Sequence, residues 1–330
     1  LRGLIEAVAI RAVGVLAGPG VVGKVAWGWL IPAIAVGALL TARVVTPARV
    51  VPAVGIDLSN GLADDGSALG DEPAIAVQVG RHSVAVPISL LVDHPSIVLS
   101  DFDSRVLLIA NLEAGRVSVL PVDLSTKAAD LEAIGTIVRA TMIYNRRFAQ
   151  FTIGMTGEMP EGGRPAGVGA RRVPVWTTVG EWRLRQRDPI VLPAGRSPAP
   201  PAPADAVVVI EQDDQVFAIP PQLLPVASNQ PMNTQVGSRY LLLVRDDAGR
   251  LHAYDRAVEQ DLFVRLERRD DPRGRTRFFD VASGSAFAPD MRAVEGELKD
   301  KRLTRIPIEP AVSLTILRRW YPNVTLTDLP

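Results

Sequence analysis

The stretch RDDAGRLH, residues 245–252, holds the side chains of this sequence that are best suited to acid–base chemistry. Asp246 and Asp247 are adjacent carboxylates, and the pKa of a histidine such as His252 ordinarily lies near neutrality. Together these groups could move protons at a reacting centre. The same stretch is also typical of a hairpin tip, where aspartates before a glycine form the turn and stay exposed and ionised. We therefore interpret both aspartates as turn residues, and His252 as a surface or partly packed residue of the next strand.

Metal and thiol chemistry has little support in the composition. The 330 residues include no cysteine, which excludes disulfides, thiolate metal ligands, iron–sulfur clusters and cysteine nucleophiles within this chain. The three histidines are His82, His94 and His252, and their spacing does not suggest a metal site. No serine-nucleophile elbow, zinc-binding helix motif or complete nucleotide motif occurs. We expect no catalytic residue, no metal and no cofactor.

Two further stretches share features with anion-binding segments. In GPGVVGKV, residues 18–25, the glycines and Lys24 have the spacing of a phosphate-binding loop, but Val25 stands where a magnesium-binding hydroxyl is needed. We interpret this stretch as a break between two helices. The basic run RLERRDDPRGRTRFF, residues 265–279, could contact phosphate or lipid headgroups, but its interleaved acidic residues and central turn favour a solvated hairpin.

The elements that must position these side chains occur twice along the chain. Residues 237–256 and 103–123 both place an apolar strand before an Ala-Gly-Arg turn and an alternating strand after it. The flanks agree as well, since AIAVQVGRHSVAVPISLL matches VVVIEQDDQVFAIPPQLL, and EWRLRQRDPIVL matches TILRRWYPNVTL. A shared order of four features indicates an internal duplication. We define the first module as residues 74–192 and the second module as residues 206–330.

Each module is predicted to be mainly β, a small barrel or sandwich, with the two in tandem. Short strands rich in Val and Leu alternate with Gly, Asp or Pro turns. Residues 131–145 fit either a helix or a buried strand pair with Gly135 between the strands, and residues 157–172 are a predicted loop. Residues 44–73 and the proline-rich residues 193–205 are predicted tethers, the second of them extended and semi-rigid.

An uncharged stretch predicts a membrane anchor. Residues 25–42 carry no charge, and ~18 to 20 apolar residues suffice to cross a bilayer as a helix. We predict a transmembrane helix at 25–43, preceded by an amphipathic interfacial segment at 1–24; a buried helix of a water-soluble protein is the alternative. Its predicted anchoring residues are Trp27, Trp29, Leu30 and Ile31. Flanking basic residues favour a cytoplasmic N-terminus, hence a single-pass protein of a bacterial inner membrane with its bulk in the periplasm.

Four stretches of the second module follow one another in a suggestive order: VFAIPPQLL, YLLLVRDDAGRLHAYDR, FFDVASGSAFAPDMRAVEGELKDKRLTRIPI and LRRWYPNVTL. In this order the module resembles a little-studied bacterial family, domain of unknown function three-one-seven-nine, over nearly all of 207–326, with a fainter likeness over 74–192. The resemblance implies two turn cysteines at the positions of Arg245 and Ala248, and of Asn111 and Ala114 in the first module. None of these residues can replace a thiolate, so the resemblance implies modules that keep the fold and lack that site.

These features favour a membrane-anchored, non-catalytic structural subunit that braces partners in a larger membrane complex, such as a photosynthetic or respiratory one. The predicted contacts to acidic partners are Arg183, Arg187, Arg245, Arg318 and Arg319. The 36 basic and 36 acidic residues balance, so no overall field favours nucleic acid. Two alternatives remain: a redox accessory or enzyme that uses the Asp, His and Arg residues above, and a small-ligand binding module with its site in the cleft between the modules.

Overall fold

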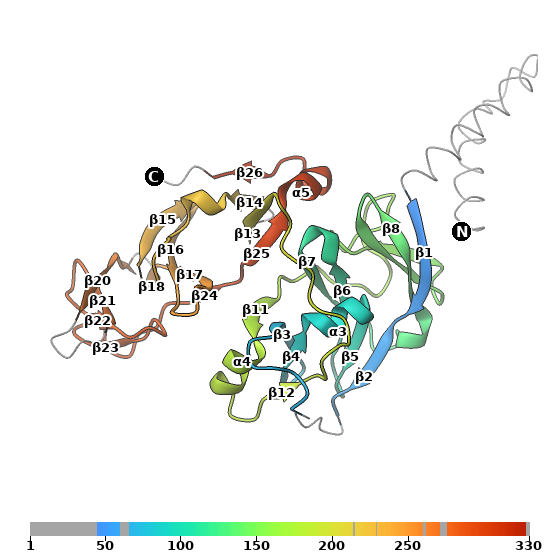
Figure 1. The fold of residues 1–330 in the computed structure, drawn as a ribbon, viewed down its shortest axis with the longest axis horizontal. Helices are drawn as coiled ribbons and strands as arrows, with labels where there is room; N and C mark the ends of the chain where they lie inside the picture. The colour runs from blue at the N-terminus through green and yellow to red at the C-terminus, as the bar shows by residue number, and fades with distance from the viewer. Residues whose placement is uncertain are drawn as a thin grey trace, which may run out of the picture.

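Short strands make up most of the computed structural model, which describes residues 45–59, 66–213, 215–228, 230–259, 262–270 and 276–327. The prediction of a mainly β fold is confirmed. Seen along the molecule, the first module lies at one end and the second at the other (Figure 1).

Each module has one sheet that combines its first two strands with its last two strands. An antiparallel hairpin forms its centre, a late strand pairs antiparallel with the first hairpin strand, and a last strand pairs parallel with the second. In the first module these strands are β3 (Pro73–Val79), β4 (His82–Pro87), β11 (Val175–Thr178) and β12 (Ile190–Val191). In the second they are β13 (Ala206–Gln212), β14 (Gln215–Ile219), β25 (Glu309–Ser313) and β26 (Thr325–Leu326).

A three-stranded meander with one added edge strand forms the second sheet of each module. The first module uses β5 (Ser96–Ser100), β6 (Arg105–Asn111) and β7 (Arg116–Pro121), with β2 (Val54–Asp57) parallel to β5. The second uses β15 (Met232–Val236), β16 (Arg239–Arg245) and β17 (Leu251–Asp255), with β24 (Arg305–Ile306) antiparallel to β17. In each module the two sheets share one core of Val, Ile and Leu side chains. This repeated topology agrees with an internal duplication, while the exact module boundaries stay a prediction.

Helices occupy equivalent places in the two modules. After β11 comes α4 (Val179–Arg185), and after β25 comes α5 (Leu314–Trp320). Hydroxyl groups cap both N-termini, because Thr178 accepts from the Glu181 amide and Ser313 from the Ile316 amide. The remaining helical segments of the described residues are α3 (Ile88–Asp93) and the 3-10 turns η1 (Leu112–Ala114), η2 (Ala128–Asp130) and η3 (Pro221–Leu223).

The modules differ in what they insert between the meander and the late strands. The first inserts β8 (Leu131–Ile137), β9 (Ala140–Asn145) and β10 (Gln150–Ile153), which form one sheet with β1 (Val45–Pro52) paired to β8. The second inserts six short strands that include the hairpin predicted at 265–279, and Leu266 and Phe278 are buried there. These strands are β18 (Ala257–Glu259), β19 (Leu262–Phe263), β20 (Leu266–Asp270), β21 (Thr276–Asp280), β22 (Ala286–Phe287) and β23 (Ala293–Glu295).

Three predictions need correction or completion. The tether predicted at 44–73 is wrong in part, because β1 and β2 of this segment join sheets. Residues 131–145 are a strand pair and not a helix, but the turn is formed by Val138 and Arg139 at positive φ, and Gly135 lies inside β8 at a bulge. The proline-rich segment 193–205 has no helix or strand, and it lies on the first module, where the Gly195 amide donates to Ser89 (Figure 1).

The predicted membrane anchor falls outside the described residues. This applies to the interfacial segment 1–24 and to the helix 25–43, including Trp27, Trp29, Leu30 and Ile31. Within the part of the chain that the structure describes, every helix is too short or too polar to cross a bilayer. The anchor therefore stays a prediction.

Candidate functional site

The two modules meet through a reciprocal contact. The β6–β7 hairpin of the first module packs near β25 and α5 of the second, and the β16–β17 hairpin of the second reaches α4 of the first. Each hairpin contributes the arginine that follows its turn glycine, Arg116 after Gly115 and Arg250 after Gly249. We call the contact around Arg116 the closed junction and the contact around Arg250 the open junction.

The closed junction is a buried group of two arginines and two glutamates. The Arg116 guanidinium, whose side chain is fully buried, pairs with Glu211 and donates from Nε to Glu309 Oε1 at 3.0 Å. Arg171, from the loop before β11, reaches the same two carboxylates, at 2.5 Å to Glu211 and 2.7 Å to Glu309. The Tyr321 ring lies 5.0 Å from the Arg116 guanidinium carbon. The charges of these four ionised side chains cancel.

Pairing keeps this group ionised despite its burial. Burial disfavours the charged form of Arg116, but Glu309, Tyr321 and Glu211 outweigh that effect and raise its pKa above the usual value. Burial likewise acts to raise the pKa of Glu211, but Arg171 and Arg116 outweigh it and lower that pKa. Removing one member would leave an uncompensated buried charge, which generally costs about 3–5 kcal/mol.

Hydrophobic and backbone contacts complete the closed junction. Ile316 of α5 packs with Ala114, Ile153 and Met155 of the first module. The Tyr321 hydroxyl donates to the Met155 carbonyl at 2.9 Å. This junction therefore fixes the second module on the first through charge, packing and hydrogen bonds at once.

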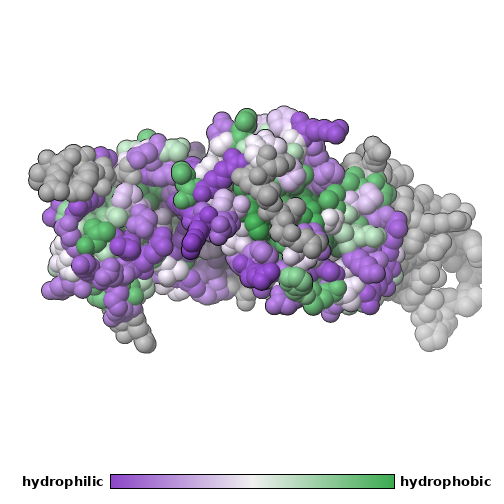
Figure 2. Space-filling model, turned by 90° about the horizontal axis from the view of Figure 1, so that it is seen from below, coloured by the Kyte–Doolittle hydropathy of each residue, from purple (hydrophilic) through white to green (hydrophobic). Residues whose placement is uncertain are grey.

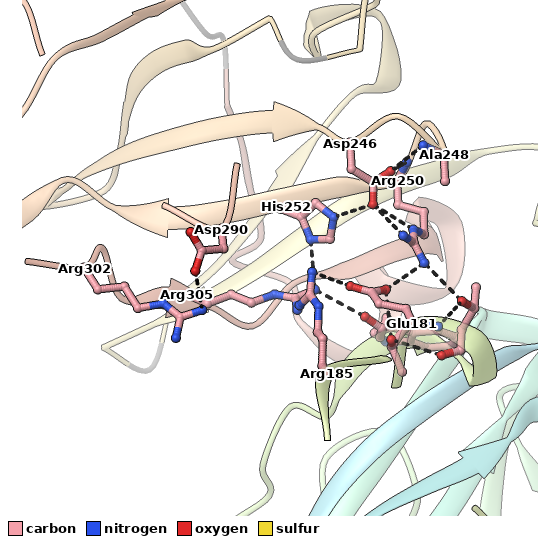
Figure 3. A network of polar contacts seen from close by, with 12 residues as sticks. Glu181, Arg185, Asp246, Ala248, Arg250, His252, Asp290, Arg302 and Arg305 are labelled. Atoms are coloured by element: carbon pink, nitrogen blue, oxygen red, sulfur yellow. Dashed lines mark hydrogen bonds and ion pairs between the residues drawn. The ribbon is translucent and has the colours of Figure 1, made fainter. Parts of the chain in front are cut away.

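The open junction is drawn in Figure 3. Arg250 Nη1 lies 2.7 Å from Glu181 Oε2 and donates to the Thr178 hydroxyl at 3.0 Å, so it joins the start of α4 to the second module. On its own hairpin, Arg250 Nε donates to Asp246 Oδ2 at 2.9 Å. Glu181 is buried and also pairs with Arg185 at 2.6 Å.

Asp246 is the turn residue that the sequence predicts, and it also organises the open junction. Its Oδ1 accepts from the backbone amides of Ala248 and Arg250, as in an Asx turn. Burial acts to raise the pKa of Asp246, but hydrogen bonds from His252 and Arg250 outweigh it and lower the pKa to about 2. Asp247, by contrast, is exposed.

His252 is buried, at 4% exposure, so its prediction as a surface or partly packed residue is wrong. Its Nε2 lies 2.9 Å from Asp246 Oδ2, and its Nδ1 lies 2.9 Å from Arg305 Nη2 (Figure 3). A guanidinium only donates hydrogen bonds, so Nδ1 accepts and the proton is on Nε2. This assigns a neutral imidazole, in agreement with a pKa that burial lowers more than the Asp246 hydrogen bond raises it.

Two cavities open beside this network. The first, of about 350 Å³, has walls that are mostly apolar, from β11, β24 and the residues around η3, and Arg250, His252 and Arg305 also line it. The second, of about 620 Å³, lies beside the end of α4 and is lined by Arg185, Tyr254, Arg302 and Arg305 among others. Arg305 lines both cavities. Figure 2 shows hydrophilic residues gathered on the surface where the two modules meet.

The chemistry open to these residues is binding more than proton transfer. Both nitrogens of His252 are engaged, and Asp246 accepts from two amides and two side chains. Among the described residues, no group of three or more His, Asp or Glu side chains is placed to hold a metal ion. The guanidinium groups, by contrast, face cavities that a ligand could enter.

The predicted partner-contact arginines lie outside this network: Arg183 on α4, Arg187 just after it, Arg318 and Arg319 on α5, and Arg245 at the end of β16. Arg187, Arg318 and Arg319 are exposed. Arg183 donates to the Ala68 carbonyl at 3.0 Å, which ties α4 to the segment that precedes β3. Arg245 donates to the carbonyls of Pro225 and Gly249, both at 2.7 Å, so it braces its own hairpin.

The sequence interpretation did not single out the residues that join the modules. Arg116 and Arg250 could have been found, because each follows the turn glycine of a repeated hairpin. Glu181, Glu211, Glu309 and Arg305 carry no such signal, since their partners lie far away along the chain.

No family model, curated protein sequence or solved structure matches this chain. The resemblance to domain of unknown function three-one-seven-nine therefore stays a prediction.

Proposed function

We propose that this protein is a non-catalytic structural subunit that is anchored in a bacterial inner membrane and braces partners of a larger membrane complex in the periplasm. The closed junction carries this proposal, because its buried ion pairs hold two sheet modules in one fixed arrangement. A brace needs a rigid spacing between its contact surfaces, and breaking any of the four ion pairs of this network would leave a poorly compensated charge.

The surface around α4 supports a role in docking. Leu184 is 90% exposed on α4, and Leu69, in the segment hydrogen-bonded to α4, is 70% exposed. Arg187 is exposed just after the helix. Exposed apolar side chains beside a cation are typical of a contact surface. On the second module, the exposed Arg318 and Arg319 of α5 supply a second basic surface.

Anchoring is supported by the sequence alone. Residues 25–42 are uncharged, and Trp27 and Trp29 lie near the start of the stretch. This composition is typical of a membrane span. The complex would then be one that works at this membrane, with a respiratory or photosynthetic assembly as the leading class.

An enzyme or redox accessory is the alternative, and its candidate groups are Asp246, Asp247 and His252. The first and last of these are bound to each other and to arginines. We therefore do not propose a reaction.

Isolation of the tagged full chain from its own membranes in mild detergent tests the proposal. We expect a stable complex in which the chain has fixed stoichiometry with other subunits, as measured by native mass spectrometry. The double variant Arg318→Glu, Arg319→Glu should release partners, whereas Arg164→Glu, an exposed change in the 157–172 loop, should not. A wild-type chain that is isolated alone and monodisperse would contradict the proposal.

A further inference from the structure

The two junctions are built from equivalent elements, yet they differ in charge and closure. The closed junction pairs two arginines with two glutamates without an opening to a described cavity. The network of the open junction holds four guanidinium groups and three carboxylates. The cations are Arg185, Arg250, Arg302 and Arg305, and the anions are Glu181, Asp246 and Asp290. One positive charge is therefore left over.

Arg305 is the cation without a carboxylate. Its Nη2 donates to His252 Nδ1 at 2.9 Å and to the Trp176 carbonyl at 3.4 Å, and both acceptors are neutral. Among the described residues, no Asp or Glu oxygen forms an ion pair with Arg305. Arginines that are partly buried are ordinarily paired with an anion.

Three guanidinium groups converge on the same cavity. Arg185, Arg302 and Arg305 line its wall together with Tyr254, and the carboxylate in that lining is Asp290. Asp290 pairs with Arg302 at 3.7 Å, and Arg302 is 65% exposed, so this pair is loose. Burial lowers the pKa of Arg305, and Arg185 lowers it further, as expected for like charges held close together.

We propose that this cavity binds a small organic anion, a carboxylate or a phosphate ester, through Arg305 with Arg185 and Arg302. Guanidinium groups suit both oxyanions, because their planar donors match pairs of carboxylate or phosphate oxygens. The volume of about 620 Å³ exceeds what a bare oxyanion fills and lies within the range of small-molecule sites. This inference goes beyond the proposed structural role and does not depend on it.

The neighbouring groups orient the principal cation. Asp246 accepts from His252 Nε2, which leaves Nδ1 free to accept from Arg305. His252 and Asp246 are therefore positioning residues that act through Arg305. The anion would also bridge the modules, since Arg185 belongs to α4 of the first and Arg305 to β24 of the second.

Calorimetric titration of the full chain in mild detergent tests the site with two probes, inorganic phosphate and succinate, each against chloride at equal ionic strength. We expect saturable binding of at least one probe to the wild type. Loss of a charged hydrogen bond is worth about 1.5–3 kcal/mol, so Arg305→Gln should weaken the apparent affinity by about 10- to 100-fold. Arg302→Gln should weaken it by a smaller factor. Arg164→Gln, an exposed change in the 157–172 loop, is the matched control and should bind like the wild type.

Two results would overturn the proposed anion site. Absence of saturable binding of both probes to the wild type overturns the site. Wild-type affinity in a folded Arg302→Gln and a folded Arg305→Gln also overturns it, because binding would then occur elsewhere. If Arg305→Gln does not fold, Arg302→Gln decides, since its side chain is largely exposed and its loss should leave the fold intact.

Discussion

Arg116 and Arg250 occupy equivalent positions after their turn glycines, but they differ in exposure. The Arg116 side chain is fully buried, whereas that of Arg250 is 32% exposed. We expect Arg116→Gln to lower the free energy of unfolding by about 3–5 kcal/mol, because Glu309 then stays buried with one partner fewer. Arg250→Gln should cost about 1 kcal/mol or less, since Arg250 itself is partly exposed and Arg185 still neutralises Glu181.

Urea unfolding followed by circular dichroism measures both values in one series. Equal costs at the two equivalent arginines would contradict the contrast between a closed and an open junction.

His252 gives the stability a pH dependence with a defined sign. Its pKa in the folded protein is lowered from the ordinary value of 6.5, by burial first and by Arg305, although Asp246 and Glu181 act in the opposite direction. The unfolded chain therefore binds a proton more readily. The stabilising contribution is present above about pH 6.5 and is lost as the pH falls below it. For one proton the slope is at most about 1.4 kcal/mol per pH unit.

The comparison of wild type with His252→Gln isolates this contribution. Between pH 7.5 and 5.5, the free energy of unfolding of the wild type should fall more steeply than that of the variant. Parallel curves for wild type and His252→Gln would refute the assignment of a neutral imidazole. Asp246 acts in a separate, lower window, because its pKa is lowered from 3.8 to about 2 and its contribution is lost as the pH falls through that interval.

The two repeated hairpins differ in how much space surrounds their turn glycines. Gly115 and Gly249 have φ values of 69° and 76°, a region that favours glycine. A Cβ at Gly115 would also overlap the Ala311 carbonyl oxygen of β25, whereas a Cβ at Gly249 would meet no atom within 4 Å. Gly249→Ala should cost about 1–2 kcal/mol from backbone strain alone.

Gly115→Ala should cost clearly more than that, because β25 must move away from the hairpin and Glu309 lies on β25. Thermal unfolding of the two variants is the measurement. A Gly115→Ala protein as stable as Gly249→Ala would show that the approach of β25 to this hairpin is not tight.

The turn between β8 and β9 offers a stabilising change. Val138 and Arg139 both adopt positive φ, 47° and 63°, which suits Asn-Gly and strains a β-branched residue. The double variant Val138→Asn, Arg139→Gly should raise the free energy of unfolding by about 1 kcal/mol. The Trp320 indole donates to the backbone carbonyl of Val138, so the hydrogen bond survives the change. A lower melting temperature would argue against this turn geometry.

Local patterns explain which elements the sequence could predict. Alternating strands and turn glycines depend on neighbouring residues, so the sequence predicts both repeated hairpins near their observed places. The sequence does not predict the strands β1 and β2, because they pair with β8 and β5, far away along the chain. The site follows the same rule, since the turn role of Asp246 is local whereas the hydrogen bond between Arg305 and His252 joins residues far apart in the chain.

At the scale of the whole molecule, the structure implies one body and not two flexibly linked modules. Segment 193–205, predicted to be a spacer, is held on the first module by Ser89 and by Asp93, which accepts from the Arg196 amide at 2.6 Å. The modules then contact each other directly at both junctions (Figure 1). The contacts at the two junctions therefore join the folded modules in addition to the linker.

Cleavage of that linker tests whether the junctions suffice. A protease site inserted between Pro200 and Pro201, both exposed, should be cut without separating the modules, so that both fragments elute together from a sizing column in mild detergent. The reason is that the closed junction combines buried ion pairs with the packing of Ile316 on Met155. The same cut in an Arg116→Gln background should let the fragments separate, because one cation of the buried group is then missing. Arg139→Gln, which alters an exposed cation, is the matched background and should leave the cut fragments associated. Immediate separation of the wild-type fragments would mean that the linker, and not the junctions, holds the two modules together.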